Sequence, residues 1–369
     1  MSLFVYGLGT SVPDHTMDQS EALHLAAGVL GPDETQLRLL KAIYRRAGVQ
    51  KRHTCVPHET GFEWAKLPAT TSDEQTTRRG ASTRVRMELY EEHAAPQAVS
   101  AASKALEAAE CPASDITHLV TISCTGFSAP GVDAALIHQL RLSPQVERVH
   151  VGFMGCHASI NGLRVASALA ASSDRNKVLM CAVELCSLHY FFDWVPDKWV
   201  SNALFADGAA ALICGSTRSE SASWRVLATG SCMLPDSSDA MSWQLGDYGF
   251  EMSLCTTVPN RIEKSLRPWL TSWLDRQGLG LADIAHWAIH PGGPRIVAAV
   301  EQALELPREA TGASREILGE FGNMSSPTIL FIAQRLLEQG VQGPCVMIAF
   351  GPGLIAEAAL IEFSGHEVT

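Results

Sequence analysis

The segment RVHVGFMGCHASINGLRVASALA, residues 148–170, decides how this chain folds. Its first part, 148–155, is predicted to be a strand, and the small residues from Cys156 to Ala171 are typical of a helix. Further apolar strands are predicted at 118–125, 177–185 and 208–215. Because apolar strands alternate with helices, we expect an α/β fold whose sheets are covered by helices on both faces.

A similar order of elements returns after a polar stretch, STRSESAS at 216–223. The second part again contains strands and helices, with a helix predicted at about 259–275 and strands at 286–290 and 345–351. We therefore expect two related halves, 1–221 and 222–369.

The composition excludes several classes of protein. The chain has 369 residues, of which 46% are hydrophobic, and a formal net charge of -11, so no basic stripe is present to bind nucleic acid. No apolar run reaches the roughly 18 residues of a membrane span, and the start, MSLFVYGLGTSVP, lacks the features of a signal peptide. The ten cysteines are scattered, without zinc-site spacings, so we expect free thiols in a reducing cytoplasm.

Cys156 directly follows the predicted strand and begins the predicted helix. A helix N-terminus presents free N–H groups and a partial positive charge, and both favour a thiolate over a thiol. Gly155 before the cysteine and small residues after it leave room for an acyl chain. On these residues alone, a buried structural cysteine and a nucleophile are equally good interpretations.

Two other segments place polar residues at the ends of apolar elements. His290 ends the strand HWAIH and is followed by Pro-Gly-Gly-Pro, which continues neither a strand nor a helix. Asn323 lies in EFGNMSSPT, between a glycine and the small residues that precede an apolar helix. Taken singly, His290 is interpreted as a structural histidine and Asn323 as a helix cap.

Together, Cys156, His290 and Asn323 form the set that thioester condensation requires. The thiolate accepts the acyl group. The imidazole and the carboxamide donate hydrogen bonds to a thioester oxygen, which stabilises an enolate formed by decarboxylation. This chemistry needs neither a metal nor a cofactor.

Motifs along nearly the whole chain resemble those of the chalcone synthase-like type III polyketide synthases. They occur in the family's order: YGLGTSVPDHTMDQ (6–19), YRRAGVQKRH (44–53), SCTGFSAPGVD (123–133), NALFADGAAALICG (202–215), HPGGPRI (290–296), FGNMSS (321–326) and FGPGLIAE (350–357). The ketoacyl synthases of fatty acid biosynthesis share the Cys, His and Asn set but resemble the HPGGP and GNMSS signatures less well. The segment GFMGCHASINGLRVA is more similar to bacterial alkylresorcinol and alkylpyrone synthases than to plant chalcone synthases.

The resemblance implies a thiolase-like, five-layered αβαβα fold built from the two halves and assembled as a homodimer. It implies that Cys156, in the first half, is the nucleophile, and that His290 and Asn323, in the second half, are its partners. The implied acyltransferase activity is iterative decarboxylative condensation of malonyl-CoA onto an acyl-CoA starter, followed by cyclisation to a resorcinol- or pyrone-type product. The bacterial likeness favours an aliphatic starter.

The resemblance also assigns residues to a substrate pocket. Phe205 lies at a family position between tunnel and cavity. At the second such position Met252 replaces the usual phenylalanine, which favours a longer or bulkier chain. Ala129 replaces a larger residue on a loop that reaches toward the partner subunit's cavity, and Cys124 replaces a threonine of the cavity wall, where it shapes the pocket or acts as a second thiol.

Aldol ring closure needs a water or hydroxyl near the growing chain. Ser325, together with the wall at Cys124 and Thr125, is expected to shape that region. Glu184, at the end of the strand 177–185, has one of two roles: it orders such a water, or it makes structural hydrogen bonds.

Basic residues are predicted to bind the phosphates of CoA, because cations, and arginine above all, bind phosphate. The set consists of Arg38, Lys41, Arg45 and Arg46, with Gly293 and Arg295 in the turn after His290 at the same tunnel mouth. The other interpretation of the first four residues is a solvated helix face.

Three other functions stay open at this point. A synthase that uses malonyl-CoA alone would give a dihydroxyphenylacetyl-type product, and a single-round ketoacyl synthase would stop after one condensation. A non-catalytic thiolase-fold subunit would pair with an active synthase, but such a subunit need not keep all three of Cys156, His290 and Asn323. Starter, number of extensions and mode of ring closure depend on cavity shape that no motif encodes. The motifs also leave open whether the donor is CoA or a carrier protein.

Overall fold

The computed structural model describes residues 2–67, 80–219 and 222–364. Its main sheet has the strand order β11-β12-β13-β8-β1-β7-β6-β4-β5. One part of this sheet consists of β1 (Leu3–Ser11), β4 (His118–Ser123), β5 (Glu147–Gly152), β6 (Lys177–Leu185) and β7 (Asp207–Gly215). The other part consists of β8 (Trp224–Met233), β11 (His286–Ile289), β12 (Gly343–Gly351) and β13 (Ile355–Phe363).

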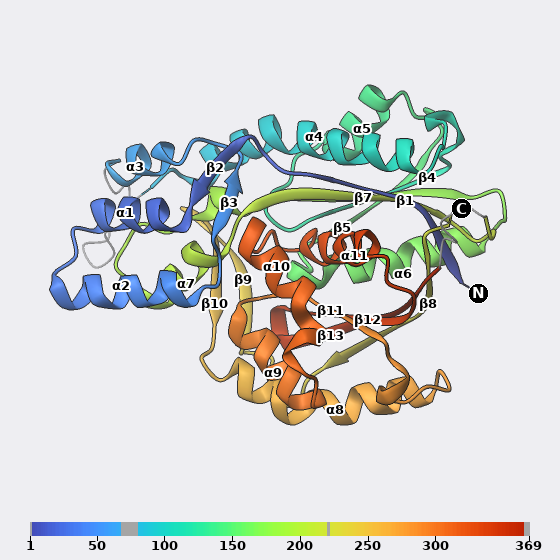
Figure 1. Cartoon of the computed structure of the whole chain (residues 1–369). Helices are drawn as coiled ribbons and strands as arrows, with labels where there is room; N and C mark the ends of the chain where they lie inside the picture. Colours follow the sequence, from blue (N-terminus) through green and yellow to red (C-terminus); the bar gives the residue numbers. More distant parts are fainter. Residues whose placement is uncertain (1, 68–79, 220–221, 365–369) are drawn as a thin grey trace.

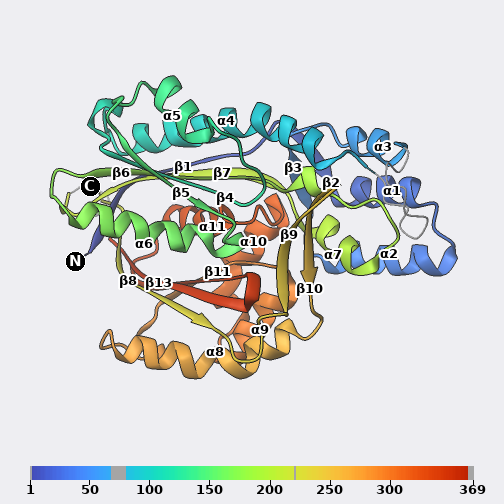
Figure 2. The same ribbon diagram turned by 180° about the vertical axis from the view of Figure 1, so that it is seen from behind.

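The two parts of the sheet lie in different layers (Figures 1 and 2). They are joined where β1 and β8 pair, over the short stretch from Leu3–Val226 to Val5–Trp224. One outer layer contains α4 (Thr83–Ala108) and α5 (Val132–Leu140), and the other contains α8 (Val258–Asp275) and α9 (Pro294–Leu304). The layer between the sheets contains α6 (Ala158–Ala171), α10 (Gly312–Phe321) and α11 (Thr328–Glu338). The order α-β-α-β-α confirms the predicted fold class.

An apolar core fills each interface between these layers. Ala102 and Leu179 belong to the core between α4 and its sheet, and Leu163 lies at the centre of the molecule among both sheets. Leu270 and Val346 belong to the core beneath α8 and α9. Each fully buried leucine stabilises the fold by about 1.5–3 kcal/mol.

The closest contact between helix and sheet joins α4 to β1. A Cβ atom on Gly7 would lie 2.3 Å from the carbonyl oxygen of Ala105, and one on Gly9 would lie 2.3 Å from that of Ala101. Glycine on the strand and alanine on the helix therefore let the two backbones approach.

A side lobe covers one end of the layers, at the left of Figure 1. Its elements are β2 (His15–Asp18), α1 (Gln19–Leu30), α2 (Glu34–Arg46), β3 (Lys51–Thr54), α3 (Glu59–Ala65), α7 (Pro196–Leu204) and the hairpin of β9 (Met241–Gly246) and β10 (Gly249–Leu254). Short 3₁₀ turns occur at η1 (Ala113–Asp115), η2 (Gly155–His157), η3 (Cys186–His189), η4 (Leu281–Asp283), η5 (Arg308–Thr311) and η6 (Pro352–Leu354).

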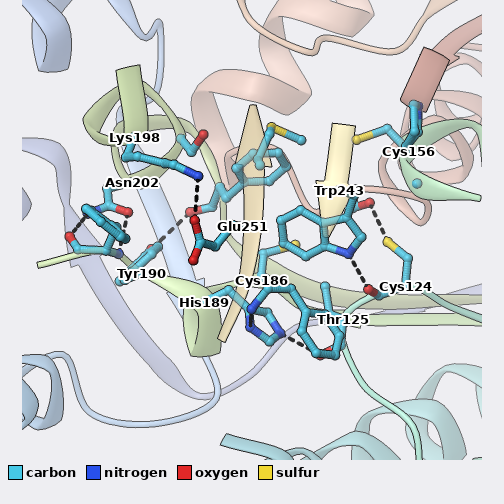
Figure 3. A pocket seen from close by; sticks show the side chains of 18 of the residues that line it. Cys124, Thr125, Cys156, Cys186, His189, Tyr190, Lys198, Asn202, Trp243 and Glu251 are labelled. Carbon is cyan, nitrogen blue, oxygen red and sulfur yellow. Dashed lines mark hydrogen bonds and ion pairs between the residues drawn. The ribbon is translucent and has the colours of Figure 1, made fainter. Parts of the chain in front are cut away.

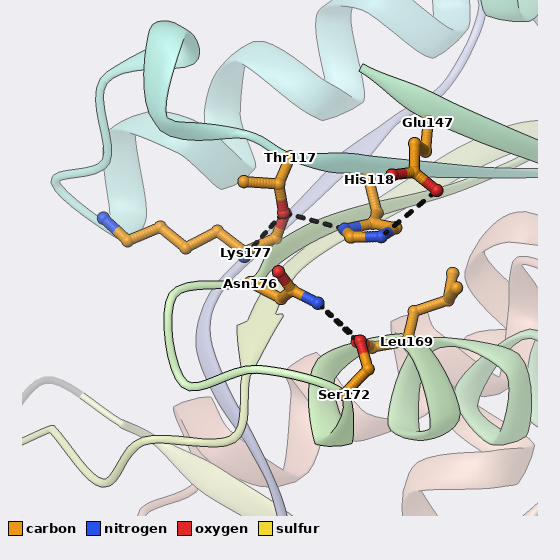
Figure 4. A network of polar contacts seen from close by, with 7 residues as sticks. All are labelled: Thr117, His118, Glu147, Leu169, Ser172, Asn176 and Lys177. Atoms are coloured by element: carbon orange, nitrogen blue, oxygen red, sulfur yellow. Dashed lines mark hydrogen bonds and ion pairs between the residues drawn. The ribbon is translucent and has the colours of Figure 1, made fainter. Parts of the chain in front are cut away.

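The strands β4, β5 and β6 run parallel, so their last residues meet at one edge of the layer. Their first residues are tied together at the opposite edge by polar contacts (Figure 4). There the hydroxyl of Thr117 lies 2.8 Å from Nδ1 of His118 and accepts a hydrogen bond of 3.0 Å from the backbone N–H of Lys177. The chain segments that contain Cys124 and Cys156 leave β4 and β5 at the other edge.

The strand predicted at 148–155 is β5, which ends at Gly152. It lies at the edge of the sheet, so Val149 is 43% exposed. The predicted boundary between residues 221 and 222 borders residues 220–221, which lie outside the described residues. Within the described ranges, every helix is too short or too polar to cross a lipid bilayer.

Candidate active site

Cys156 lies in the turn η2, between β5 and α6, whereas the sequence predicts it directly after the strand and at the start of the helix; β5 ends at Gly152 and α6 begins at Ala158. The preceding Gly155 has φ 76°, and a Cβ atom there would lie 2.5 Å from Cδ of Pro352. Glycine is required at 155 for both reasons. This tight turn packs the Cys156 loop against η6, and Cys156, which is 7% exposed, lies on the wall of a cavity.

Burial decides the protonation state of the Cys156 thiol. It raises the pKa of this thiol to about 11, although hydrogen bonds from the side chains of Ser325 and Asn323 act in the opposite direction. The backbone hydrogen bond at Cys156 lowers the pKa, in the direction expected of a helix start, but desolvation is the larger effect, so the net shift favours the thiol.

The carboxamide of Asn323 is oriented by its own loop. Its Oδ1 accepts a hydrogen bond of 2.8 Å from the backbone N–H of Ser325, which has the left-handed φ of 56°. The backbone of Asn323 pairs with the end of α7, where its N–H donates to Leu204 O and its C=O accepts from Ala206 N, both at 2.9 Å. Since Oδ1 is engaged, the NH₂ group is the part of the amide that serves as a donor.

His290 follows β11, and its backbone N–H donates to Ile348 O at 2.8 Å. Burial, followed by the neighbouring His157, lowers the pKa of His290 to about 3, so its ring is neutral. Within the described part of the chain, neither ring nitrogen has a hydrogen-bond partner. A buried imidazole with both nitrogens available is uncommon in a structural role and suits a ligand-binding one.

The cavity brings together four of the predicted pocket residues: Cys124, Phe205, Met252 and Ser325. The Sγ of Cys124 lies 3.6 Å from the hydroxyl of Ser325, so these two side chains form one wall with Cys156. Ala129 does not line the cavity; it is exposed, in a loop that contains the cis Ala129–Pro130 bond. The prediction that Ala129 reaches toward a partner subunit stays a prediction.

Glu184 is buried and held by donors of its own chain. One carboxylate oxygen accepts from the backbone of Cys124 at 2.9 Å and the hydroxyl of Thr125 at 2.7 Å, and the other accepts from the hydroxyl of Ser326 at 2.7 Å. Burial raises the pKa of this carboxyl group. The contacts support the structural interpretation of Glu184: it fixes the loop of Cys124 against the loop of Ser326.

A hairpin that the sequence interpretation missed closes the cavity. Trp243 of β9 donates from Nε1 to the carbonyl oxygen of Cys124 at 2.6 Å. His189 donates from Nε2 to Thr125 O at 2.6 Å and accepts at Nδ1 from the backbone of Phe250 at 2.9 Å, with its ring stacked on Phe250. These bonds fasten the hairpin of β9 and β10 to the end of β4.

Figure 3 shows the two ends of this cavity. Cys156 and Cys124 lie at one end, Tyr190 and Asn202 lie at the other, and Trp243 and Glu251 lie between them. Much of the cavity lining is sulfur-containing or apolar: Cys124, Cys186, Phe205, Met241, Trp243, Phe250, Met252 and Pro352. Cys156 therefore lies on the wall of a largely apolar cavity whose far end is polar.

The predicted CoA-binding residues do not line this cavity. Lys41 and Arg46 are exposed on α2, as are Arg38 and Arg45, and Arg295 is exposed at the start of α9. The two helices meet here, because a Cβ atom on Gly48, just after α2, would lie 2.7 Å from Pro294 Cγ. Gly293 caps α9 with φ 138°. The structure therefore brings the end of α2 and the turn after His290 to one place on the surface.

The fold is that of the thiolase-like condensing enzymes. Residues 2–218 match the model of the N-terminal domain of chalcone and stilbene synthases, and residues 226–364 match that of their C-terminal domain. The chain belongs to this family of type III polyketide synthases, which are acyltransferases.

Similar proteins have names of the same class. The alpha-pyrone synthesis polyketide synthase-like Pks18 of Mycobacterium tuberculosis is 32% identical over 97% of this chain and 90% of its own length. The 1,3,6,8-tetrahydroxynaphthalene synthase of Streptomyces peucetius is 34% identical over 97% of this chain and 93% of its own. The crystal structure of PKS-I from the brown alga Ectocarpus siliculosus superposes with a TM-score of 0.88, at 29% identity, over 98% of both chains.

Proposed function

We propose that this protein carries an acyl starter on Cys156, extends it repeatedly with malonyl-CoA, and cyclises the chain to a resorcinol- or pyrone-type product. The observation that carries the proposal is the position of the Cys156 thiol on the wall of an apolar cavity, with Ser325 and the oriented amide of Asn323 beside it. The names of the relatives, a synthase of alpha-pyrone and a synthase of tetrahydroxynaphthalene, are consistent with such products.

Loading is a thioester exchange. The sulfur of Cys156 attacks the carbonyl carbon of the acyl-CoA, the C–S bond to CoA breaks, and the thiol proton leaves with the CoA sulfur. The high pKa of Cys156 makes the free thiolate scarce, so proton removal accompanies attack. We assign the transfer of this proton to His290, whose ring nitrogens have no hydrogen-bond partner among the residues that the structure describes.

Condensation follows on the same site. Malonyl-CoA loses CO₂, and the enolate oxygen that results is stabilised by donors from the neutral imidazole of His290 and the NH₂ group of Asn323. The enolate carbon attacks the acyl thioester, a C–C bond forms, and the Cys156 sulfur is released. The lengthened chain, now on CoA, reloads for the next round.

The cavity selects the starter and shapes ring closure. Its predominantly apolar lining and the flexible Met252 favour an aliphatic chain that passes Phe205. Ser325 and Cys124 lie beside the nucleophile, where a chain folds back for ring closure, and Cys124 has the role of a pocket wall. The malonyl-only reaction is the second candidate, because several polar groups line the far end of the same cavity.

CoA is the proposed donor, with its phosphates at the surface where Gly48 meets Pro294; the exposed Arg46 and Arg295 adjoin this contact in the sequence, and Lys41 is exposed on the same helix as Arg46. Arginine at the start of α9 also adds to the positive end of that helix, next to Gly293. No cofactor takes part in the proposed reaction.

We further propose a cytoplasmic homodimer. The edge strand β5 and the loops beside it expose four large apolar side chains, Phe127, Val149, Phe153 and Met154, which a second copy would cover. Ala129 lies two residues from Phe127 and would then face the partner. All ten cysteines are free thiols, which suits a reducing compartment.

The test is to incubate purified protein with malonyl-CoA, alone and with a panel of acyl-CoAs, and to identify products by mass spectrometry. Products of several extensions that contain the added starter are expected. Products from malonyl-CoA alone would favour the second candidate. A single extension would indicate a ketoacyl synthase, and no product would indicate a non-catalytic partner subunit.

A further inference from the structure

The active-site cavity contains an ion pair between Trp243 and the polar end formed by Tyr190 and Asn202. Lys198 of α7 and Glu251 of β10 approach to 3.2 Å between Nζ and Oε2, and each side chain is 20% exposed (Figure 3). Both line the cavity that contains Cys156. The aliphatic chain of Lys198 places its ammonium 5.8 Å from the centre of the Phe191 ring.

Charges in such a place reduce the stability of the fold. An exposed ion pair contributes about 0–1 kcal/mol to the stability of a protein. When an ion pair is withdrawn from water, both charges lose hydration free energy, and their mutual attraction offsets this loss only in part. The Lys198–Glu251 pair lines the cavity and is not on the solvated surface. A functional reason is therefore needed for its position.

The polar neighbours at this end are already engaged by the backbone. The hydroxyl of Tyr190 donates to Phe205 O at 3.0 Å. The amide of Asn202 accepts from the N–H of Phe191 at 3.0 Å and donates to its carbonyl oxygen at 2.7 Å. The ammonium of Lys198 differs: it has three N–H donors, and its hydrogen-bond partner among the described residues is Glu251. Donor capacity therefore remains for a ligand.

We propose that Lys198 and Glu251 bind a hydroxyl or enol O–H group on the acyl chain, remote from the thioester. The oxygen of this group accepts a hydrogen bond from the Lys198 ammonium, and its O–H donates a hydrogen bond to the Glu251 carboxylate. A carboxylate on the chain is disfavoured, because Glu251 neutralises Lys198 and would repel a second anion. This inference rests on the proposed function, since it names the chain that Cys156 carries.

A methyl-terminated chain fits this end poorly. It would remove water from the pair without replacing the hydrogen bonds, which is unfavourable for buried polar groups. Two sources supply the favoured group: a hydroxyl already present on the starter, or the enol form of the β-keto units that extension adds. Both present one oxygen that donates and accepts.

The first experiment measures loading alone, without malonyl-CoA. Wild-type protein is titrated with straight-chain acyl-CoAs of six to twelve carbons and with their ω-hydroxy counterparts, and the acylation of Cys156 is followed by intact-mass spectrometry. If the starter supplies the hydroxyl, the half-saturating concentration is about tenfold lower for the hydroxylated chain at the length that spans the cavity. Lys198→Met and Glu251→Gln remove that preference.

The second experiment adds malonyl-CoA and an unsubstituted acyl-CoA. If the growing chain supplies the enol, loading shows no hydroxyl preference, but Lys198→Met lowers the yield of products with two or more extensions about tenfold relative to single-extension products. The double variant Lys198→Met/Glu251→Met leaves no unpaired charge and is expected to lose the same products. Lys198→Arg is expected to retain part of the yield of products with two or more extensions. The matched control is Lys177→Met, which removes the lysine of a surface ion pair with Asp115 of 2.9 Å.

The inference is overturned if Lys198→Met, folded by its melting curve, changes neither the hydroxyl preference nor the number of extensions. In that case Cys156 still becomes acylated, and the proposed function stands. If no acyl-CoA modifies Cys156 in the wild type, the proposed function fails and this inference fails with it.

Discussion

The Oδ1 atom of Asn323 accepts a hydrogen bond of 2.8 Å from the backbone N–H of Ser325, two residues further along the same loop. This bond closes a small turn at Ser325. The positive φ of Ser325 is a strained backbone conformation for a residue other than glycine. Its consequence is chemical: the amide oxygen is engaged, so the amide NH₂ group is presented toward Cys156. A loop residue thus becomes an oriented donor before any substrate binds.

Replacement of Asn323 tests this orientation. We expect Asn323→Ala to leave acylation of Cys156 intact while lowering malonyl-CoA decarboxylation about 100-fold, because one donor to the enolate oxygen is lost. Carbon dioxide release measures the second step, and intact mass measures the first. Equal losses in both steps would contradict a role limited to the enolate. Thr328→Val is a control for the loop, since the Thr328 hydroxyl accepts from Met324 N at 2.9 Å.

The high pKa of Cys156 predicts that its rate of alkylation depends on pH, and the thiol of Cys255 serves as the reference. A raised pKa means that the thiol form persists at neutral pH, so alkylation by iodoacetamide accelerates about tenfold per pH unit between about pH 7 and 9. Cys255 is exposed, and hydrogen bonds from Thr257 lower its pKa, so it reacts first at neutral pH. Peptide mapping by mass spectrometry distinguishes the two sites. Faster labelling of Cys156 than of Cys255 at pH 7 would contradict the expected order of the two thiol pKa values.

Met252 is predicted to set the width of the cavity. We expect Met252→Phe to reduce loading of the longest accepted acyl-CoA about tenfold relative to the shortest, because the larger, stiffer ring fills space beside Phe205. Met233→Phe is the matched control, since Met233 is 58% exposed on β8. An unchanged preference for chain length in Met252→Phe would remove Met252 from the selection of the starter.

The exposed edge at β5 predicts the site of dimerisation. We expect Val149→Lys to weaken the dimer about tenfold or more, because a lysine on an edge strand opposes pairing with a second strand. Sedimentation velocity over a range of protein concentrations measures the effect, with Met233→Lys as the surface control. A dimer of unchanged stability would place the interface elsewhere.

Local sequence predicts much of the fold around Cys156. The strand before it and the helix after it follow from periodicity and small-residue content, and the structure has both, with the turn η2 between them. Whether β5 is central or at an edge depends on which strand pairs with it, and no local pattern contains that information. The same limit applies to the pKa of Cys156: the favourable effect of the turn is a local feature, but the larger effect of burial comes from distant loops.

The far side of the site could not be predicted for the same reason. Lys198 and Glu251 are 53 positions apart, and Trp243 reaches Cys124 across 119 positions. Only the packing of the hairpin on α7 and on the end of β4 brings these residues together. For Ala129, by contrast, only the resemblance predicts a place in a pocket, and in the single chain this residue is exposed on the surface.

The most direct test of the central claim is acyl transfer to Cys156. Wild-type protein, Cys156→Ala and the exposed-thiol control Cys255→Ala are mixed with an acyl-CoA that the wild type extends, and intact masses are recorded. We predict one added acyl mass on the wild type and on Cys255→Ala, located on Cys156 by peptide mapping, and none on Cys156→Ala. The same adduct on Cys156→Ala at the wild-type level would contradict the assignment of the nucleophile.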